Sequence, residues 1–204
     1  MTAPRPDRAG YHHGDLPRAL VDASVGLIAR HGVDGFSLRS AAREAGVNPA
    51  AVYRHFADRA DLLRAVSIVG FRELADRMDE AMSGAGDPAA RFAAGGAAYV
   101  RFALERPEFF RVMFGRHGAG PDGIRGRGAG RSGRSAYDLL LGALRDLDAE
   151  CGLVLALDDA VTVAWSAVHG LASLLVDGVL ELTGTGVDAA VGATTRTAMR
   201  GLTR

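Results

Sequence analysis

The stretch GVNPAAVYRHF, Gly46 to Phe56, contains the features that decide the fold of the N-terminal region. Gly46 ends one predicted helix, Asn48 caps the next, and Pro49 occupies the first position of that helix, where a missing backbone N–H costs nothing. Val52 and Phe56 are four residues apart and are therefore expected to face the core. The stretch predicts two short helices joined by a tight turn, which are the dimensions of a helix-turn-helix.

The other side chains of this stretch are predicted to lie outside the core. Tyr53, Arg54 and His55 suit a phosphate-lined groove, because Tyr and His donate hydrogen bonds to phosphate and Arg adds charge. Ala50 and Ala51 leave no bulk to obstruct base edges and are able to touch thymine methyl groups. The pattern favours a DNA-contacting helix, with a plain helical hairpin as the alternative.

Apolar residues recur at helical spacing along nearly the whole chain, and no stretch alternates convincingly with period two. The sequence is therefore predicted to be all-α. The segment Ser83–Asp87 is expected to separate two halves. The expected helices span Asp15–His31, Leu38–Ala45, Pro49–Phe56, Asp58–Met82, Pro88–Glu105, Pro107–Phe114, Ser135–Cys151, Asp158–Thr183 and Val187–Leu202.

The segment Gly115–Ser135 is rich in glycine and arginine and has no apolar stripe. It is predicted to be a flexible loop. Within it, GAGRSG at Gly128 to Gly133 matches the dinucleotide-binding pattern G-x-G-x-x-G, but no strand precedes it. A flexible connector is therefore the better interpretation.

The composition sets limits on compartment and partners. The chain has 204 residues with 24 basic and 24 acidic side chains, so its net charge neither supports nor excludes a nucleic-acid partner. The single cysteine, Cys151, is expected to be a free buried thiol in a reducing cytosol. We expect a soluble cytoplasmic protein without a membrane partner, because neither a signal peptide nor a run of about 18 apolar residues is evident.

Patterns typical of enzymes are weak in this sequence. The six histidines do not show metal-ligand spacing, and no serine lies in a nucleophile-elbow glycine pattern. We therefore predict neither an enzyme nor a cofactor or metal site.

A long N-terminal run closely resembles the DNA-binding region of the TetR family of bacterial transcriptional regulators. The run is Tyr11–Val66, YHHGDLPRALVDASVGLIARHGVDGFSLRSAAREAGVNPAAVYRHFADRADLLRAV. In it the helix-turn-helix, a Tyr-x-His-Phe cluster and a basic residue three positions after that Phe coincide. The later part resembles the regulatory domain of one subgroup more weakly, through PEFFRVMF at Pro107–Phe114 and WSAVHG at Trp165–Gly170.

The resemblance implies a specific domain organisation. Residues 1–10 would form a flexible arm, and residues 11–66 a three-helix helix-turn-helix domain whose fourth helix continues to about Met82. Residues 87–204 would form a helical-bundle domain for ligand binding and dimerisation, with the flexible loop at 115–135.

The resemblance also assigns roles in DNA binding. It gives phosphate contacts to Ser37, Tyr53, His55 and Arg59. It gives groove contacts to Arg39, Ala50 and Ala51, and Asn48 and Arg54 complete the expected DNA-contacting set. Arg39 sits early in its helix and is able to reach a guanine, with a solvated surface arginine as the alternative. Because Pro49, Ala50 and Ala51 offer few hydrogen-bonding groups, DNA shape is expected to add specificity. Backbone contacts from the arm are expected at Arg5, Arg8, His12 and His13.

For the second half, the resemblance implies a mostly apolar effector cavity between helices. The expected ligand-binding residues are Phe92, Tyr99, Phe102, Phe110, Met113, Trp165 and His169. Tyr99 and His169 are the polar candidates. Ordinary core packing is the alternative for each residue, and His169 has the dimer interface as a further alternative.

The expected helix Asp158–Thr183 is apolar on nearly every side and therefore needs a second layer of protein. The resemblance implies that this helix and Val187–Leu202 form a four-helix interface with a second copy of the chain. We expect a homodimeric repressor that a small apolar or amphipathic effector releases from a palindromic operator. An activator or a ligand-independent DNA-binding protein is the alternative.

Overall fold

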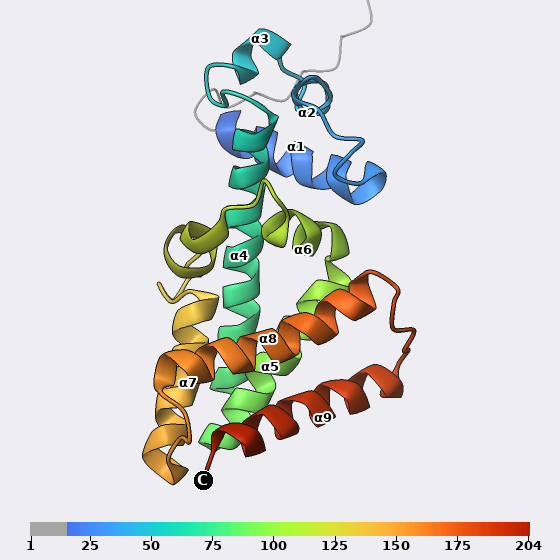
Figure 1. Cartoon of the computed structure of the whole chain (residues 1–204). Helices are drawn as coiled ribbons and strands as arrows, with labels where there is room; N and C mark the ends of the chain where they lie inside the picture. Colours follow the sequence, from blue (N-terminus) through green and yellow to red (C-terminus); the bar gives the residue numbers. More distant parts are fainter. Residues whose placement is uncertain (1–15) are drawn as a thin grey trace, which may run out of the picture. The chain divides into compact units, whose positions relative to one another are not determined.

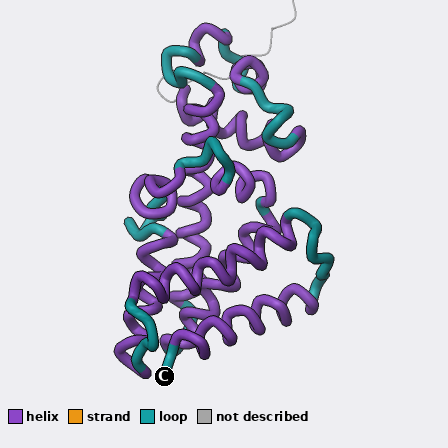
Figure 2. Tube along the Cα trace, viewed as in Figure 1, coloured by secondary structure: helices purple, strands orange, loops and turns teal. Residues whose placement is uncertain are grey.

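The computed structural model describes residues 16–204, and within this range every regular element is helical (Figures 1 and 2). The prediction of an all-α fold is confirmed. The expected arm over residues 1–10, with Arg5 and Arg8, and also His12 and His13, lies outside the described residues. The elements are α1 (Leu16–His31), α2 (Leu38–Glu44), α3 (Pro49–Val52), α4 (Arg59–Ser83), α5 (Pro88–Glu105), α6 (Pro107–Phe114), the π-helical η1 (Asp122–Arg127), α7 (Ala136–Cys151), α8 (Leu157–Val176) and α9 (Thr185–Leu202).

The chain divides into two compact units, one ending at Arg59 and the other beginning at Ala60. The predicted boundary at residues 83–87 is therefore wrong. From Ala60 onward α4 belongs to the second unit, where Phe71 packs edge-on against Phe114 of α6 with ring centroids 5.3 Å apart. Residues 83–87 form the turn between α4 and α5.

The first unit packs α1, α2 and α3 around a small apolar core. Leu20, Ile28 and Val52 are at most 2% exposed. Ser37 caps α2, since its hydroxyl accepts a 3.1 Å hydrogen bond from the backbone N–H of Ser40. The N-cap that the sequence predicts for this helix is confirmed.

The second unit is built around α5, which packs against α6, α7, α8 and α9. Helices α8 and α9 lie alongside one another (Figure 1). Small residues on α5 allow the neighbouring helices to pack closely against it, since a Cβ at Gly96 would lie 2.7 Å from Cγ2 of Thr195 on α9. A Cβ at Gly95 would similarly lie 3.0 Å from Sδ of Met82 on α4. The glycines therefore set the spacing between these helices.

The glycine- and arginine-rich segment 115–135 is not the unstructured loop that the sequence predicts. It contains η1, and the backbone N–H of Ala119 donates a 2.9 Å hydrogen bond to Oγ of Ser67 on α4. Gly123 packs so closely on the Phe71 ring that a Cβ there would overlap it. The prediction of a loop came from the low helix propensity of glycine. In the structure, the missing side chain of glycine instead allows the backbone of this segment to approach α4 closely.

Ionic contacts hold the end of this segment on α4. The Arg131 side chain pairs with Asp76 at 3.3 Å, and the Arg131 backbone N–H donates a 2.7 Å hydrogen bond to the same carboxylate. Arg134 pairs with Asp79. Two acidic residues one turn apart on α4 therefore bind two arginines of the segment.

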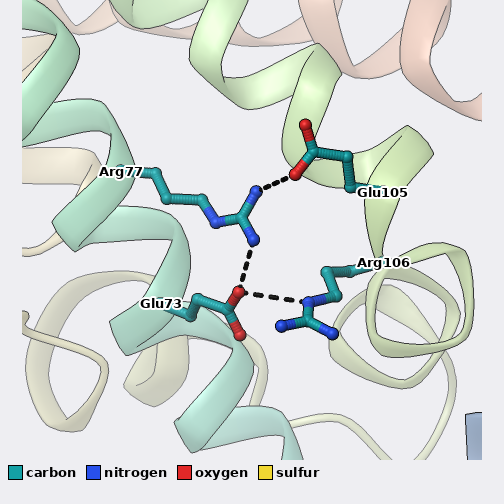
Figure 3. Close-up of polar contacts among 4 residues, drawn as sticks. All are labelled: Glu73, Arg77, Glu105 and Arg106. Carbon is teal, nitrogen blue, oxygen red and sulfur yellow. Dashed lines mark hydrogen bonds and ion pairs between the residues drawn. The ribbon is translucent and has the colours of Figure 1, made fainter.

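A charged cluster joins α4 to the corner between α5 and α6 (Figure 3). Arg77 lies between two carboxylates, pairing with Glu73 at 2.7 Å and also with Glu105. Arg106 donates to the same Glu73 oxygen at 3.2 Å. The Arg77 guanidinium also lies 5.5 Å from the centroid of the Phe102 ring, so one side chain links the charged surface to the core.

Two further predictions, both at helix ends, are wrong. The helix predicted over Asp158–Thr183 ends at Val176, because Gly178 adopts a φ of 68° and the chain turns back. Cys151, predicted to be buried, is exposed at the end of α7, and its thiol donates to the carbonyl of Leu147 at 3.2 Å.

Candidate DNA-binding surface and effector cavity

The turn between α2 and α3 has a fixed geometry. Gly46 adopts a φ of 69°, a left-handed conformation that glycine accepts without strain. The N–H of Val47 donates a 2.9 Å hydrogen bond to the carbonyl of Ala42, and the Asn48 side chain accepts one of 2.9 Å from Ala50. Asn48 is therefore the helix cap that the sequence predicts, and its side-chain oxygen is engaged in that role.

The residues after this cap divide into buried and exposed sets. Val52 is fully buried and Phe56 is 7% exposed, which confirms both as core residues. Tyr53 is 56% exposed, and Arg54 and His55 are also exposed. Regular helix ends at Val52, earlier than predicted, so the exposed trio lies in the following turn.

The remaining predicted DNA contacts on α2 and α3 lie at the surface to different degrees. Arg39 and Ala50 are exposed, and Ala51 is half-buried. The Ser37 hydroxyl is exposed but donates a 3.0 Å hydrogen bond to the Ser40 hydroxyl within the capping box. Arg39, the second residue of α2, is therefore an exposed cation near the N-terminus of this helix.

Arg59 has partners inside the first unit. Its Nε donates a 3.1 Å hydrogen bond to the carbonyl of Phe36, and its guanidinium also binds the carbonyl of Val33. The guanidinium lies 5.8 Å from the centroid of the Phe36 ring. Arg59 thus ties the start of α4 to the turn between α1 and α2, a role that its sequence pattern did not indicate.

A cavity of about 40 Å³ lies inside the second unit. Its walls come from α4, α5, η1, α7, α8 and α9. Within residues 16–204, no charged side chain lines it. Such a site binds apolar molecules by contact and excludes water from them.

The predicted ligand-binding residues divide into two groups. Phe92, Tyr99 and Trp165 line the cavity. Phe102, Phe110, Met113 and His169 do not line it. The first three of this second group are buried in the packed core at 0%, 4% and 1% exposure. His169 is half-buried and lies behind Tyr99, to which it is hydrogen-bonded.

Several lining residues were missed by the sequence reasoning. They include Met78, Met82, Ile124, Tyr137, Leu140 and Thr195. Their apolar spacing within each helix is the same as that of core residues, so a single sequence contains no signal that separates them. Ile124 also lies in the segment that was predicted to be a loop.

Tyr99 is the buried centre of a hydrogen-bonded group whose other members, Trp165 and His169, are half-buried. Its hydroxyl lies 2.8 Å from Nδ1 of His169 and accepts a 3.3 Å hydrogen bond from the Trp165 indole N–H. Burial raises the pKa of Tyr99 well above its ordinary value, and burial lowers the pKa of His169. Both shifts favour the uncharged forms, in which the Tyr99 O–H is able to donate a hydrogen bond to an unprotonated Nδ1 of His169.

Helices α8 and α9 present an apolar groove at the surface. Leu155, Val163 and Ala167 line it from one side, and Ala198 and Leu202 line it from the other. Val163 is 44% exposed. Ala198 also lines the internal cavity, so one small residue of α9 borders both spaces.

Within residues 16–204, α8 is the helix with the length and composition to cross a membrane, with a mean hydropathy of 1.4. Of this apolar stretch, 39% is buried inside the unit. The same composition is expected of a helix that packs in a core on one side and in a protein interface on another.

A helix-turn-helix unit followed by an all-α unit with an internal apolar cavity defines the class of helical DNA-binding regulators. Two family models match the chain in these places. The model for bacterial regulatory proteins of the tetR family matches residues 20–66, and the model for the tetracyclin repressor-like C-terminal domain matches residues 92–198. The chain therefore belongs to the TetR family of DNA-binding transcriptional regulators.

Solved structures show the same fold. A protein of unknown function from Rhodococcus sp. RHA1 shares 35% identity, with 96% of this chain and 100% of that one covered and a TM-score of 0.77. A TetR family transcription regulator from Marinobacter aquaeolei VT8 shares 21% identity over 92% and 95%, with a TM-score of 0.66. The regulator FadR from Bacillus subtilis, solved in complex with stearoyl-CoA, shares 16% over 90% and 98%, with a TM-score of 0.70. No curated protein matches the chain.

Proposed function

We propose that this chain is a cytoplasmic, homodimeric repressor that binds a palindromic operator and is released from it by a small-molecule effector. The observation that carries the proposal is the exposed Tyr53–Arg54–His55 trio, which follows a helix-turn-helix turn of fixed geometry. Within residues 16–59, an aromatic, a cation and an imidazole adjacent in sequence all lie at the surface, where they are accessible to a partner.

In the proposed complex, the trio and the residues before it have different roles. Tyr53 and His55 donate hydrogen bonds to backbone phosphates and set the register of the protein on DNA. The small side chains of Ala50 and Ala51 allow α3 to approach the bases, and Arg39 reads a base edge from α2. Sequence preference then depends on few direct contacts and on the shape of the DNA.

The apolar groove of α8 and α9 supports a homodimer. Val163 is exposed within an otherwise small-residue and aliphatic surface, and such a surface is stable in water when a second copy covers it. Two-fold symmetry requires an operator with two half-sites about one helical turn of DNA apart.

The position of the cavity supports an effector that acts through the dimer. Ala198 borders both the cavity and the groove, so an occupant that moves α9 also changes the surface that the partner contacts. An effector releases DNA by binding one dimer geometry more tightly than the other. The complex of Bacillus subtilis FadR with stearoyl-CoA supports a small-molecule effector for this fold in general.

The test uses the intergenic DNA beside the locus of the protein and a scrambled duplex, with binding measured by fluorescence anisotropy at several salt concentrations. The double variant Tyr53→Ala/His55→Ala should bind both duplexes more weakly, with a salt slope reduced by about 1–2. The matched control is His31→Ala, an exposed histidine of α1 in the same unit. Unchanged affinity and salt slope in the double variant would show that this surface does not contact DNA.

A further inference from the structure

The cavity of the second unit contains information on the chemistry of its occupant. Two of its polar lining residues, Tyr99 and Thr195, already have protein partners. The Tyr99 hydroxyl bonds to His169 and Trp165, and the Thr195 hydroxyl donates to the carbonyl of Val191 at 3.0 Å. The Thr195 oxygen is still able to accept a hydrogen bond from an occupant, and Tyr137 is a further lining residue with a hydroxyl group.

The walls offer no cation to a negatively charged occupant. Within residues 16–204, every lining side chain is uncharged. The guanidinium of Arg125 lies 4.0 Å from the centroid of the Tyr137 ring, but Arg125 is exposed and does not line the cavity. A carboxylate or phosphate would lose its hydration and gain no ion pair, which strongly disfavours binding.

The size of the cavity limits the occupant as well. Its volume of about 40 Å³ is far below the 300–1,000 Å³ typical of ligand pockets. Met78 and Met82 form the wall from α4, and their unbranched side chains change conformation easily. At the lining residue Gly96 a Cβ would lie 2.7 Å from Cγ2 of Thr195, so the α5 backbone there is close-packed and cannot move aside in the same way.

We propose that the effector is a compact, uncharged and mainly apolar molecule, about one ring or a short alkyl chain in size, with at most one hydroxyl group that donates to Thr195. This inference rests on the proposed function, since it names the effector class of the same regulator. Ionised analogues of the same size are excluded from the cavity.

Trp165 supplies a direct readout, because it lines the cavity and is the single tryptophan of the chain. The probes are benzyl alcohol with benzoate, 1-hexanol with hexanoate, and toluene, added to the full chain near pH 7.5, where both acids are ionised. Free tryptophan amide corrects for direct quenching. Each neutral probe should give a saturable change, with a Kd about tenfold or more below that of its paired carboxylate.

A matched pair of variants on α7 locates the binding site. Ala143→Leu adds bulk inside the cavity, whereas Ala149→Leu adds the same bulk at an exposed position of the same helix. The first variant should lose the saturable change and the second should keep it. Circular dichroism and thermal melting establish that both variants are folded.

Thr195→Val supplies a second test that does not depend on filling the cavity. It keeps the shape of the side chain and removes the hydroxyl, so the affinity for benzyl alcohol should fall about 3- to 10-fold while that for toluene is unchanged. This variant decides the question if Ala143→Leu does not fold.

The proposal is overturned if the carboxylates bind as tightly as the neutral probes, if no neutral probe gives a saturable change, or if Ala143→Leu binds like Ala149→Leu. Fluorescence requires no DNA, so these results are independent of the operator experiment. Normal operator binding together with a negative fluorescence result would reject the effector class and leave the DNA-binding function intact. Binding of neutral probes without operator binding would support the effector class and reject the proposed DNA-binding function.

Discussion

The Tyr99 hydroxyl and Nδ1 of His169 lie 2.8 Å apart, joining α5 to α8 through a partly buried hydrogen bond. Tyr99 also accepts from the Trp165 N–H, so its own O–H is available to donate to Nδ1 of His169 when that nitrogen carries no proton. A proton on Nδ1 would reverse the direction of this hydrogen bond and leave the Tyr99 O–H without this acceptor. Donation by Tyr99 therefore requires an unprotonated Nδ1.

This requirement predicts a stability that depends on pH. Burial lowers the pKa of His169 in the folded chain below its ordinary value of about 6.5, so the unfolded chain binds the proton first. The contribution of His169 to stability is complete above that ordinary value and is lost as the pH falls through the folded pKa. His169→Asn keeps an acceptor and does not titrate, so its melting temperature should fall less than that of the wild type between about pH 7.5 and pH 5.

Thermal melting at both pH values measures this difference, with His31→Asn as an exposed control expected to follow the wild type. Equal losses of melting temperature in His169→Asn and in the wild type would contradict the role given to His169.

Arg59 and Arg54 are predicted to respond differently to substitution. Arg59→Ala removes hydrogen bonds to two backbone carbonyls and should lower the free energy of unfolding by about 1–3 kcal/mol. Arg54 is exposed, so Arg54→Ala should change stability by less than about 0.5 kcal/mol while it weakens DNA binding. Urea unfolding and anisotropy on the same samples separate the two effects. Full stability in Arg59→Ala would show that its contacts in the first unit contribute little.

The glycines of residues 115–135 provide a test of the packing on α4. A Cβ at Gly128 would overlap the carbonyl oxygen of Gly123 and the side chain of Phe71, so Gly128→Ala should destabilise by about 1–3 kcal/mol. A Cβ at Gly126 meets no neighbouring atom, so the free energy of unfolding of Gly126→Ala should stay within about 1 kcal/mol of that of the wild type. Urea unfolding compares the two. Similar values for both variants would mean that this segment is not held against α4.

The apolar groove of α8 and α9 predicts the effect of a charge placed there. In a two-fold dimer, Val163→Glu brings two carboxylates near each other, and the dissociation constant should rise about 100-fold or more. Ala149→Glu adds the same charge at an exposed site of α7 and should leave it unchanged. Analytical ultracentrifugation gives both constants. Unaltered self-association of Val163→Glu would place the interface elsewhere.

Local signals in the sequence predict most of the fold. Ser37, Asn48 and Gly46 mark helix ends by chemistry that acts within a few residues, and the structure places helix boundaries at these residues. Helical spacing predicts the burial of Val52 and Phe56, and both are buried although regular helix ends at Val52. Tyr53 is exposed as predicted, but it lies in the turn after α3.

The cavity and the segment before α7 are less predictable, because both depend on contacts between distant parts of the chain. Ile124 lines the cavity, and its neighbour Gly123 packs closely on Phe71, some fifty residues earlier in the chain. Phe102 and Phe92 are both aromatic residues of α5, and their positions relative to the neighbouring helices decide which of them lines the cavity. A helical pattern in one sequence does not contain that relationship.

Ala198 borders the effector cavity and the α8–α9 groove at once. A change of size at this position would alter ligand fit and subunit fit together. In the dimer that we propose, a duplicated gene whose inducer preference changed at residue 198 would also encode a poorer partner for the parent protein, and separate homodimers would then be favoured over mixed dimers.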